Sequence, residues 1–172
     1  MKLKKIRIIN YRCFKDADID FDEHTTLIVG KNGAGKTAIL DAVAVAVSTF
    51  LLGIDGGAGR SISKDDARYE FHDLDGTVDP QHQFPVSIES IGDCLDNHDV
   101  KWVRSLNSES GNTTIKEARE LTNISKETQK KIMTGDKLLI LPLISYYGTG
   151  RLYAQKKEKK NIKSLTVLFR SD

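Results

Sequence analysis

The residues best suited to chemistry lie in one stretch that reads G-x-x-x-x-G-K-T. Its glycines permit tight backbone turns that a Cβ would penalise, so successive N–H groups can face one concavity and bind phosphate oxygens. Lys36 offers an ammonium to the β- and γ-phosphates, and the Thr37 hydroxyl is placed to ligate Mg²⁺. We therefore predict a phosphate-binding P-loop that binds a nucleoside triphosphate. Its candidate residues are Gly30, Asn32, Gly33, Ala34, Gly35, Lys36, Thr37 and Ala38.

The segments on either side of this stretch agree with that prediction. Thr25–Val29 is short, apolar and rich in β-branched residues, which predicts a buried strand. Residues 38–52 contain no Pro or Gly and predict a helix, whose positive dipole end would face the phosphates. Apolar residues occupy almost every side of this helix, so we expect it to be buried between layers.

Asp41 interrupts this apolar helix four residues after Thr37 and therefore lies on the same helical face. A carboxylate in this place has two interpretations. It can orient Thr37 or a water molecule at the metal, or it can pair with a nearby Lys or Arg.

Composition sets loose bounds on the class of protein. The 172 residues carry a net charge of +2, which is too small to indicate a nucleic-acid partner by itself. Cys13 and Cys94 have no metal-ligand or disulfide-framework spacing, and the four histidines lie scattered among polar turns. No run approaches the ~18 apolar residues of a membrane span, so we expect a cytoplasmic protein without a membrane partner.

The remaining chain predicts strands around one further helix. Residues 2–12 and 18–22 alternate and predict an antiparallel pair ahead of the P-loop, and residues 84–91 and 101–106 predict two more antiparallel strands. A polar helix is expected over 114–133, a central strand over 138–147 and a short last strand over 165–169.

The order strand, N-Y-R-C-F, strand, strand, then G-K-N-G-A-G-K-T-A-I-L-D-A resembles the N-terminal half of an ABC-type ATPase head of the RecF/SMC group. The chain is most similar there to prokaryotic "AAA family" ATPases, including the PtuA type of Septu defence systems and overcoming-lysogenization-defect ATPases. Further matching stretches are 66–68, 84–86, 102–104 and 141–151. The resemblance implies an α/β P-loop NTPase fold with a mixed sheet and an N-terminal antiparallel β lobe.

The resemblance also implies roles for single residues and for partners. Arg12 matches the position that reaches the nucleotide phosphates, although a surface arginine at a strand end is the other interpretation. Gln83 or Gln81 is the candidate Q-loop glutamine that contacts Mg²⁺, and Arg151 is a candidate contact to phosphate or to a partner head. The implied cofactors are ATP and Mg²⁺. The implied partners are a second head in a nucleotide-sandwiched homodimer, DNA, and a nuclease or effector protein, in repair or phage defence.

The chain departs from the family pattern in its catalytic parts. No run of four apolar residues followed by Asp-Glu is present, so the Walker B strand is missing, and no L-S-G-G-like signature occurs. We therefore expect 1–172 to be a single partial ATPase domain that binds nucleotide far better than it hydrolyses it.

Two other functions stay open at this point. A non-catalytic nucleotide-sensing module that binds a partner protein fits the missing Walker B strand. A GTPase-like switch has the D-x-x-G pattern at 73–76 but lacks an N-K-x-D base-reading motif. The basic run 156–163 is a candidate DNA contact or a solvated face.

Overall fold

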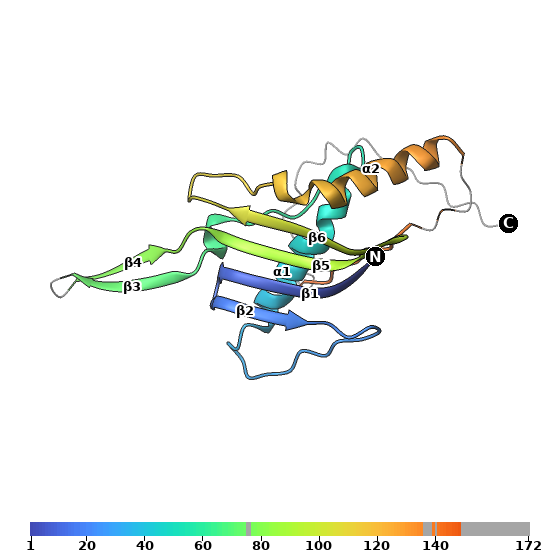
Figure 1. Cartoon of the computed structure of the whole chain (residues 1–172). Helices are drawn as coiled ribbons and strands as arrows, with labels where there is room; N and C mark the ends of the chain where they lie inside the picture. Colours follow the sequence, from blue (N-terminus) through green and yellow to red (C-terminus); the bar gives the residue numbers. More distant parts are fainter. Residues whose placement is uncertain (75–76, 136–138, 140, 149–172) are drawn as a thin grey trace, which may run out of the picture.

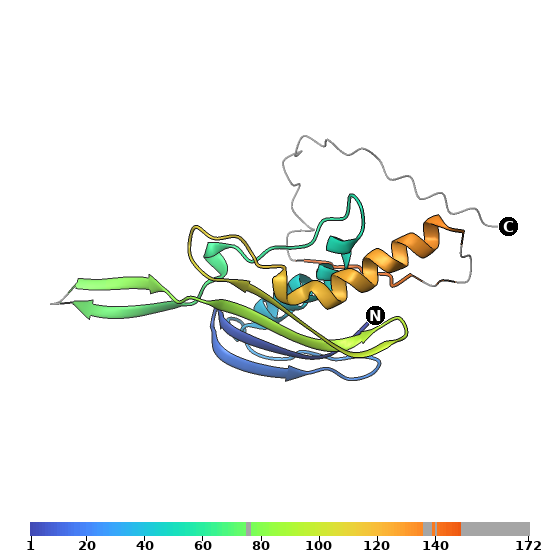
Figure 2. The same cartoon turned by 45° about the horizontal axis from the view of Figure 1, so that its top comes forward.

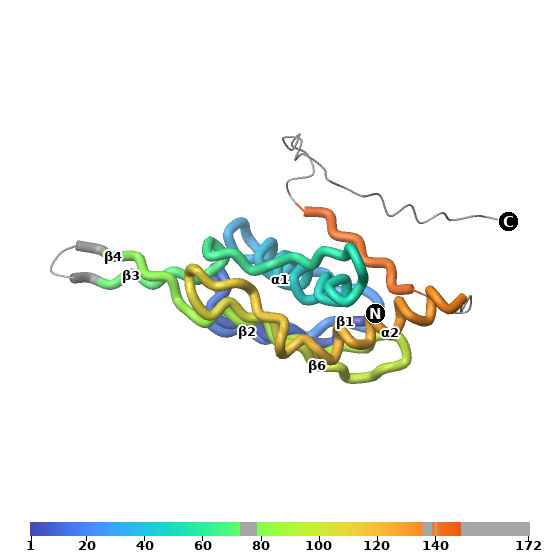
Figure 3. The backbone as a smooth tube through the Cα atoms, turned by 90° about the horizontal axis from the view of Figure 1, so that it is seen from above, coloured from blue at the N-terminus to red at the C-terminus, as the bar shows by residue number. Residues whose placement is uncertain are grey.

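A computed structural model describes residues 1–74, 77–135, 139 and 141–148. Within them an antiparallel sheet of four strands has the order β2-β1-β5-β6. The helix α1 crosses one face of this sheet and contacts β1, β5 and β6, as Figure 3 shows from above. The strands of the sheet are β1 (Lys2–Tyr11), β2 (Phe14–Asp20), β5 (Val86–Cys94) and β6 (Asn97–Leu106).

The helices lie on and beside this sheet. The P-loop helix α1 (Lys36–Ser48) continues into the 3₁₀ turn η1 (Thr49–Gly53), and α2 (Arg119–Met133) packs against η1 and β6 (Figure 2). The short turns η2 (Lys64–Asp66) and η3 (Lys116–Ala118) precede β3 and α2. The predicted helices over 38–52 and 114–133 are thus confirmed, with a 3₁₀ turn at one end of each.

A separate hairpin of β3 (Tyr69–Leu74) and β4 (Thr77–His82) projects from one end of the sheet (Figure 1). It joins the body where Arg68 N–H donates to the carbonyl of Asn10 at 2.9 Å.

Buried and exposed side chains alternate along β1, and the buried ones belong to the core. Ile6 and Ile8 are fully buried against α1, whereas Lys5 and Arg7 on the opposite face pair with Asp18 and Asp16 of β2. The other core side chains come mainly from β5, β6 and α1, and they are Val86, Ile88, Trp102, Ala42, Val45 and Ala46. The predicted antiparallel lobe and the α/β fold class are confirmed, and every strand pair among the described residues is antiparallel.

The predicted strand over Thr25–Val29 is wrong. These residues form no strand, and the side chains of Leu27 and Val29 are both 81% exposed. A strand needs a neighbour to pair with, and no described segment lies in register beside this one. The predicted strand over 138–147 is likewise not formed across 141–147, whereas residues 165–169 lie outside the described residues.

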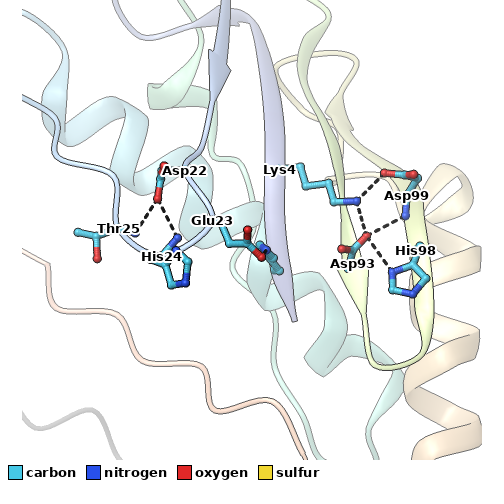
Figure 4. Close-up of polar contacts among 9 residues, drawn as sticks. Lys4, Asp22, Glu23, His24, Thr25, Asp93, His98 and Asp99 are labelled. Carbon is cyan, nitrogen blue, oxygen red and sulfur yellow. Dashed lines mark hydrogen bonds and ion pairs between the residues drawn. The ribbon is translucent and has the colours of Figure 1, made fainter.

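After β2 ends, a local turn directs the chain away from the sheet. The Asp22 carboxylate accepts the N–H groups of His24 and Thr25 at 2.9 and 3.3 Å, which holds the pKa of Asp22 below its usual range (Figure 4). The Asp22 side chain thus accepts backbone N–H groups in a local turn, in place of the hydrogen bonds that a neighbouring strand would make. The chain therefore leaves the sheet before the P-loop.

The expectation that no run reaches the length of a membrane span was wrong. Lys36–Gly53 has 18 residues and is apolar enough by length and composition alone to cross a membrane. In this structure the same segment is α1 with η1, and one side of it packs on the sheet. A core helix has the same composition, so packing on the sheet accounts for the apolar run.

Burial of α1 is one-sided, whereas we had expected it to be enclosed between layers. Ala38, Ala42, Val45 and Ala46 are buried, but Leu40 on the opposite side is 48% exposed. Residues 143–147 line a groove along this outer side together with Leu40 and Val43, and they pass along α1 in Figure 3.

Candidate phosphate-binding site

The P-loop lies at the N-terminus of α1 and is open to solvent from Gly30 to Ala34. Gly33 and Gly35 have φ angles of +83° and +87°, in the left-handed region that side chains rarely adopt. Gly35 is the N-cap of α1, so the first N–H groups of the helix have no partner within the helix itself. The chain thus presents amide donors and a positive helix end at one open loop.

The side chain of Lys36 bonds back to the first residues of the P-loop. Its ammonium donates to the carbonyls of Gly30 and Lys31, both at 2.7 Å. An ammonium has three N–H donors, so these two bonds leave a third one for an anion in the loop. The lysine therefore both shapes the loop and carries positive charge into it.

Thr37 is exposed in the first turn of α1. A hydroxyl here, next to an ammonium and unpaired amides, is a donor set that fits a triphosphate carrying Mg²⁺. No group of three or more His, Cys, Asp or Glu that could hold a metal occurs among the described residues. A metal ion at this loop would therefore take its other ligands from phosphate oxygens and water molecules.

The turn between β1 and β2 packs directly on the P-loop. A Cβ added to Gly35 would lie 2.6 Å from the Phe14 ring and 2.7 Å from Cys13 Sγ. This close approach requires glycine at position 35 for a second reason besides its φ angle. It also brings Arg12, which precedes Cys13, to the first turns of α1.

Arg12 lies between two carboxylates. Its Nε donates to Asp66 at 2.8 Å and its Nη1 to Asp41 at 2.6 Å, and its backbone N–H donates to the Asp66 carbonyl at 2.7 Å. The Arg12 φ of +51° is strained for a residue with a side chain, and these bonds hold it in place. Arg12 is thus not a loose surface arginine at a strand end.

Asp41 pairs with arginines, which is one of its two predicted interpretations. Besides Arg12 it pairs with Arg60 Nη2 at 3.0 Å, and the Tyr146 hydroxyl donates to it. Burial, followed by this hydrogen bond to Asp41, raises the pKa of Tyr146. No bond between Asp41 and Thr37 is present among the described residues.

Sequence reasoning missed three members of this cluster. Asp66 and Tyr146 fell within stretches quoted for the family resemblance, but nothing in their spacing assigned them to the site. Arg60 lies in a glycine-rich stretch, a composition typical of loops, which did not assign it to the site. Only the fold brings these residues to α1, since each comes from a different segment.

The two candidate glutamines lie at the base of the β3–β4 hairpin. Gln83 Nε2 donates to the carbonyl of Gln81 at 3.3 Å, and Gln81 Nε2 donates to Asp79 at 3.2 Å. No hydrogen bond in the described part of the chain links either glutamine to Thr37. Their role at Mg²⁺ stays a prediction, and Arg151 and the run 156–163 lie outside the described residues.

Comparisons with known proteins agree with this arrangement. A family model described as an AAA domain matches residues 5–171. A DNA double-strand break repair Rad50 ATPase from Archaeoglobus fulgidus is 50% identical over 44 residues, which are 26% of this chain and 5% of that protein. A DNA replication and repair protein RecF from Flavobacterium johnsoniae is 49% identical over 43 residues, 25% of this chain and 12% of that protein.

A longer alignment covers most of the chain. The Rad50 ATPase from Pyrococcus abyssi is 26% identical over 183 aligned residues, 81% of this chain and 21% of that protein. The chain therefore spans only a small part of the curated relatives that it matches. The resemblance to RecF/SMC-like heads drawn from the sequence is confirmed.

Proposed function

This chain belongs to the AAA domain family, and we propose that it is the ATP-binding N-terminal part of a RecF/SMC-like head. One observation carries the proposal. The P-loop leads directly into the N-terminus of helix α1. The β1–β2 turn, which includes Arg12, packs on Gly35 of this loop. The loop amides and the Lys36 ammonium lie at one exposed loop, and Arg12 bonds Asp41 in the adjoining turns of α1, which supports phosphate binding here.

Each residue has a defined task in this proposal. Lys36 donates to the β- and γ-phosphates, and the loop amides from Gly30 to Thr37 bind the phosphate oxygens. Thr37 holds Mg²⁺, with Gln83 as the candidate second contact, and the ion supplies neutralisation of phosphate charge. Arg12 adds a planar cation, whose orientation Asp41 and Asp66 fix.

Hydrolysis requires groups that these 172 residues do not contain. The sequence holds no Walker B strand and no signature motif. Apolar side chains are exposed before the P-loop, at Leu27 and Val29, and well after it, at Leu143. Their exposure supports the proposal that further strands cover them in a complete head. We expect ATPase activity of the complete protein and little from this chain alone.

The relatives support a proposal about partners and pathway. Proteins whose names state DNA repair match about a quarter of this chain in two cases and most of its length in a third. We propose an ATP-gated homodimer of heads that acts on DNA in the cytoplasm, in repair or in phage defence. In phage defence a nuclease or effector protein would be the further partner.

Calorimetry with MgATP tests the proposal, with Lys36→Ala beside the wild type and a hydrolysis assay on both. We expect wild-type binding, at least about 100-fold weaker binding by the variant, and negligible turnover, because the ammonium contributes charge-assisted bonds. Binding that survives Lys36→Ala would overturn the P-loop site. Rapid turnover by the wild type would overturn the partial-head proposal.

A nucleotide-sensing module that binds a partner protein is the second candidate function. The absence of a Walker B strand from the sequence favours it. Hydrolysis that appears when the C-terminal half of a related head is supplied would support the ATPase, whereas binding without hydrolysis in that mixture would support the sensor. Competition of ATP against GTP separates both from a GTPase-like switch, since strong ATP preference removes that switch.

A further inference from the structure

Asp41 is enclosed, with its side chain only 7% exposed, and both of its oxygens are engaged. Oδ2 accepts a bond from Arg12 Nη1 at 2.6 Å, and Oδ1 pairs with Arg60 Nη2 at 3.0 Å. The Tyr146 hydroxyl also donates to Oδ1. One buried carboxylate thus joins three side chains from three separate segments of the chain.

Arg60 and Tyr146 also contact each other. The guanidinium carbon of Arg60 lies 5.2 Å from the centre of the Tyr146 ring, within the range of a cation–π contact. Residues 143–147 line a groove on the outer side of α1, the segment 141–148 has no strand partner among the described residues, and Leu143 is 95% exposed. The hydrogen bond from Tyr146 to Asp41 is therefore a polar tether of this segment to the P-loop helix, beside the packing of Ile144 on the core.

Arg12 connects the same carboxylate to the phosphate site. Its guanidinium has five N–H donors, and the bonds to Asp41 and Asp66 use two of them. Asp41 follows Thr37 by about one helical turn, or roughly 6 Å along the axis. A phosphate at Thr37 would thus attract the guanidinium that now compensates Asp41.

We propose that Asp41 is a positioning residue that couples occupation of the P-loop to the segment 141–148 through Tyr146. This inference rests on the proposed nucleotide binding and adds a conformational consequence to it. Without nucleotide, Arg12 and Arg60 share the Asp41 carboxylate with the Tyr146 hydroxyl. With nucleotide, Arg12 donates to phosphate as well, and its hold on Asp41 weakens.

The direction of the coupling follows from charge. When the interaction with one cationic partner weakens, a buried carboxylate binds its remaining partners more strongly, because a buried charge must be compensated. Nucleotide binding accordingly strengthens the contacts of Asp41 with Arg60 and Tyr146. The Tyr146 side chain is partly exposed and can exchange its bond for water, so the segment responds to a modest change in this interaction.

Hydrogen exchange followed by mass spectrometry on the full chain, with and without MgATP, tests the coupling. Tyr146→Phe keeps the ring over Arg60 and removes only the hydroxyl. Tyr147→Phe is the matched control, since Tyr147 is 75% exposed and makes no bond to Asp41 in the described part of the chain. Nucleotide affinity is measured by calorimetry on the same samples.

We expect MgATP to slow exchange in 141–148 by about fivefold in the wild type and in Tyr147→Phe. In Tyr146→Phe this difference disappears although MgATP still binds. Asp41→Asn loses the difference too, and it binds MgATP more weakly because Arg12 is no longer oriented.

Three results would overturn the inference. A nucleotide-dependent difference that persists in Tyr146→Phe excludes the hydroxyl as the link. Wild type that binds MgATP without any change in 141–148 excludes the coupling and leaves the proposed function standing. A wild type that binds no MgATP overturns the proposed function, and the coupling with it.

Discussion

The two ends of α1 are built in different ways. At the C-terminal end, Trp102 Nε1 donates to the carbonyl of Ala46 at 3.0 Å, and Arg104 donates to Thr49 Oγ1 at 3.2 Å. Both β6 side chains are almost fully buried. At the N-terminal end, the loop from Gly30 to Ala34 is exposed and holds its shape through backbone conformation and Lys36.

This difference separates stability from binding along one helix. Helix ends leave backbone groups without partners, and a protein can satisfy them with its own side chains or keep them for a ligand. Here side chains of β6 bond the Ala46 carbonyl and the Thr49 hydroxyl at the C-terminal end, and the amide end stays open. Changes at the C-terminal end should therefore lower the free energy of unfolding without lowering nucleotide affinity, whereas changes at the N-terminal end should lower nucleotide affinity as well.

The largest expected effect is at the closed end. Trp102→Ala removes a fully buried indole and its bond to Ala46, and we expect the free energy of unfolding to fall by about 4 kcal/mol. Trp102→Phe keeps most of the packing and should lower it by only about 1–2 kcal/mol. Urea denaturation followed by circular dichroism measures both. Equal losses in the two variants would show that the hydrogen bond, not the packing, anchors α1.

A second prediction compares two glycines at the open end. Gly35→Ala combines a left-handed φ with a Cβ 2.6 Å from the Phe14 ring, and we expect a loss of about 3 kcal/mol in stability. Gly33→Ala has a similar φ but nothing within 4 Å, so the expected loss is about 1 kcal/mol. Denaturation of both variants isolates the contact with the β1–β2 turn. If the two losses are equal, that turn does not pack tightly on the P-loop.

A third prediction concerns Arg104, which is buried without a carboxylate partner among the described residues. Burial lowers the pKa of this guanidinium, and its Nε donates to the carbonyl of Thr114 at 2.8 Å. Arg104→Met removes the bonds to Thr114 and Thr49 and also the cost of burying a charge, so we expect a loss of only about 1–2 kcal/mol. Thermal unfolding measures it, and MgATP affinity should not change. A large fall in affinity would show that the two ends of α1 are not independent.

The smallest effect is expected at the end of β1 farthest from Arg12. There Lys4 donates to Asp93 and Asp99, and the bond from Lys4 lowers the pKa of Asp93 to about 2 (Figure 4). A lowered folded-state pKa stabilises the protein above the ordinary pKa of 3.8, and this contribution is lost as the pH falls toward 2.

Melting temperatures of wild type and Asp93→Asn across this pH range test the linkage. The difference between them should be present at pH 6, shrink as the pH falls through about 3.8, and vanish only below about pH 2. A difference that is constant with pH would show that the carboxylate charge of Asp93 does not stabilise the fold.

The sequence predicted well where local pattern and chemistry coincide. Alternation placed Ile6 and Ile8 inside, and G-x-x-x-x-G-K-T placed a loop at the start of a helix. It failed for Thr25–Val29, because an apolar run records a preference for burial but not the presence of a neighbouring strand. Asp66, Arg60 and Tyr146 could not be found either, since only long-range folding brings them to Asp41.

The bonds from Lys36 to the carbonyls of Gly30 and Lys31 have a kinetic consequence. They close the loop into a ring that already has its shape before any ligand arrives. Association then needs no slow ordering of the chain, and the observed rate of nucleotide binding should rise linearly with nucleotide concentration. Selectivity among phosphate compounds would accordingly arise from how long each remains bound.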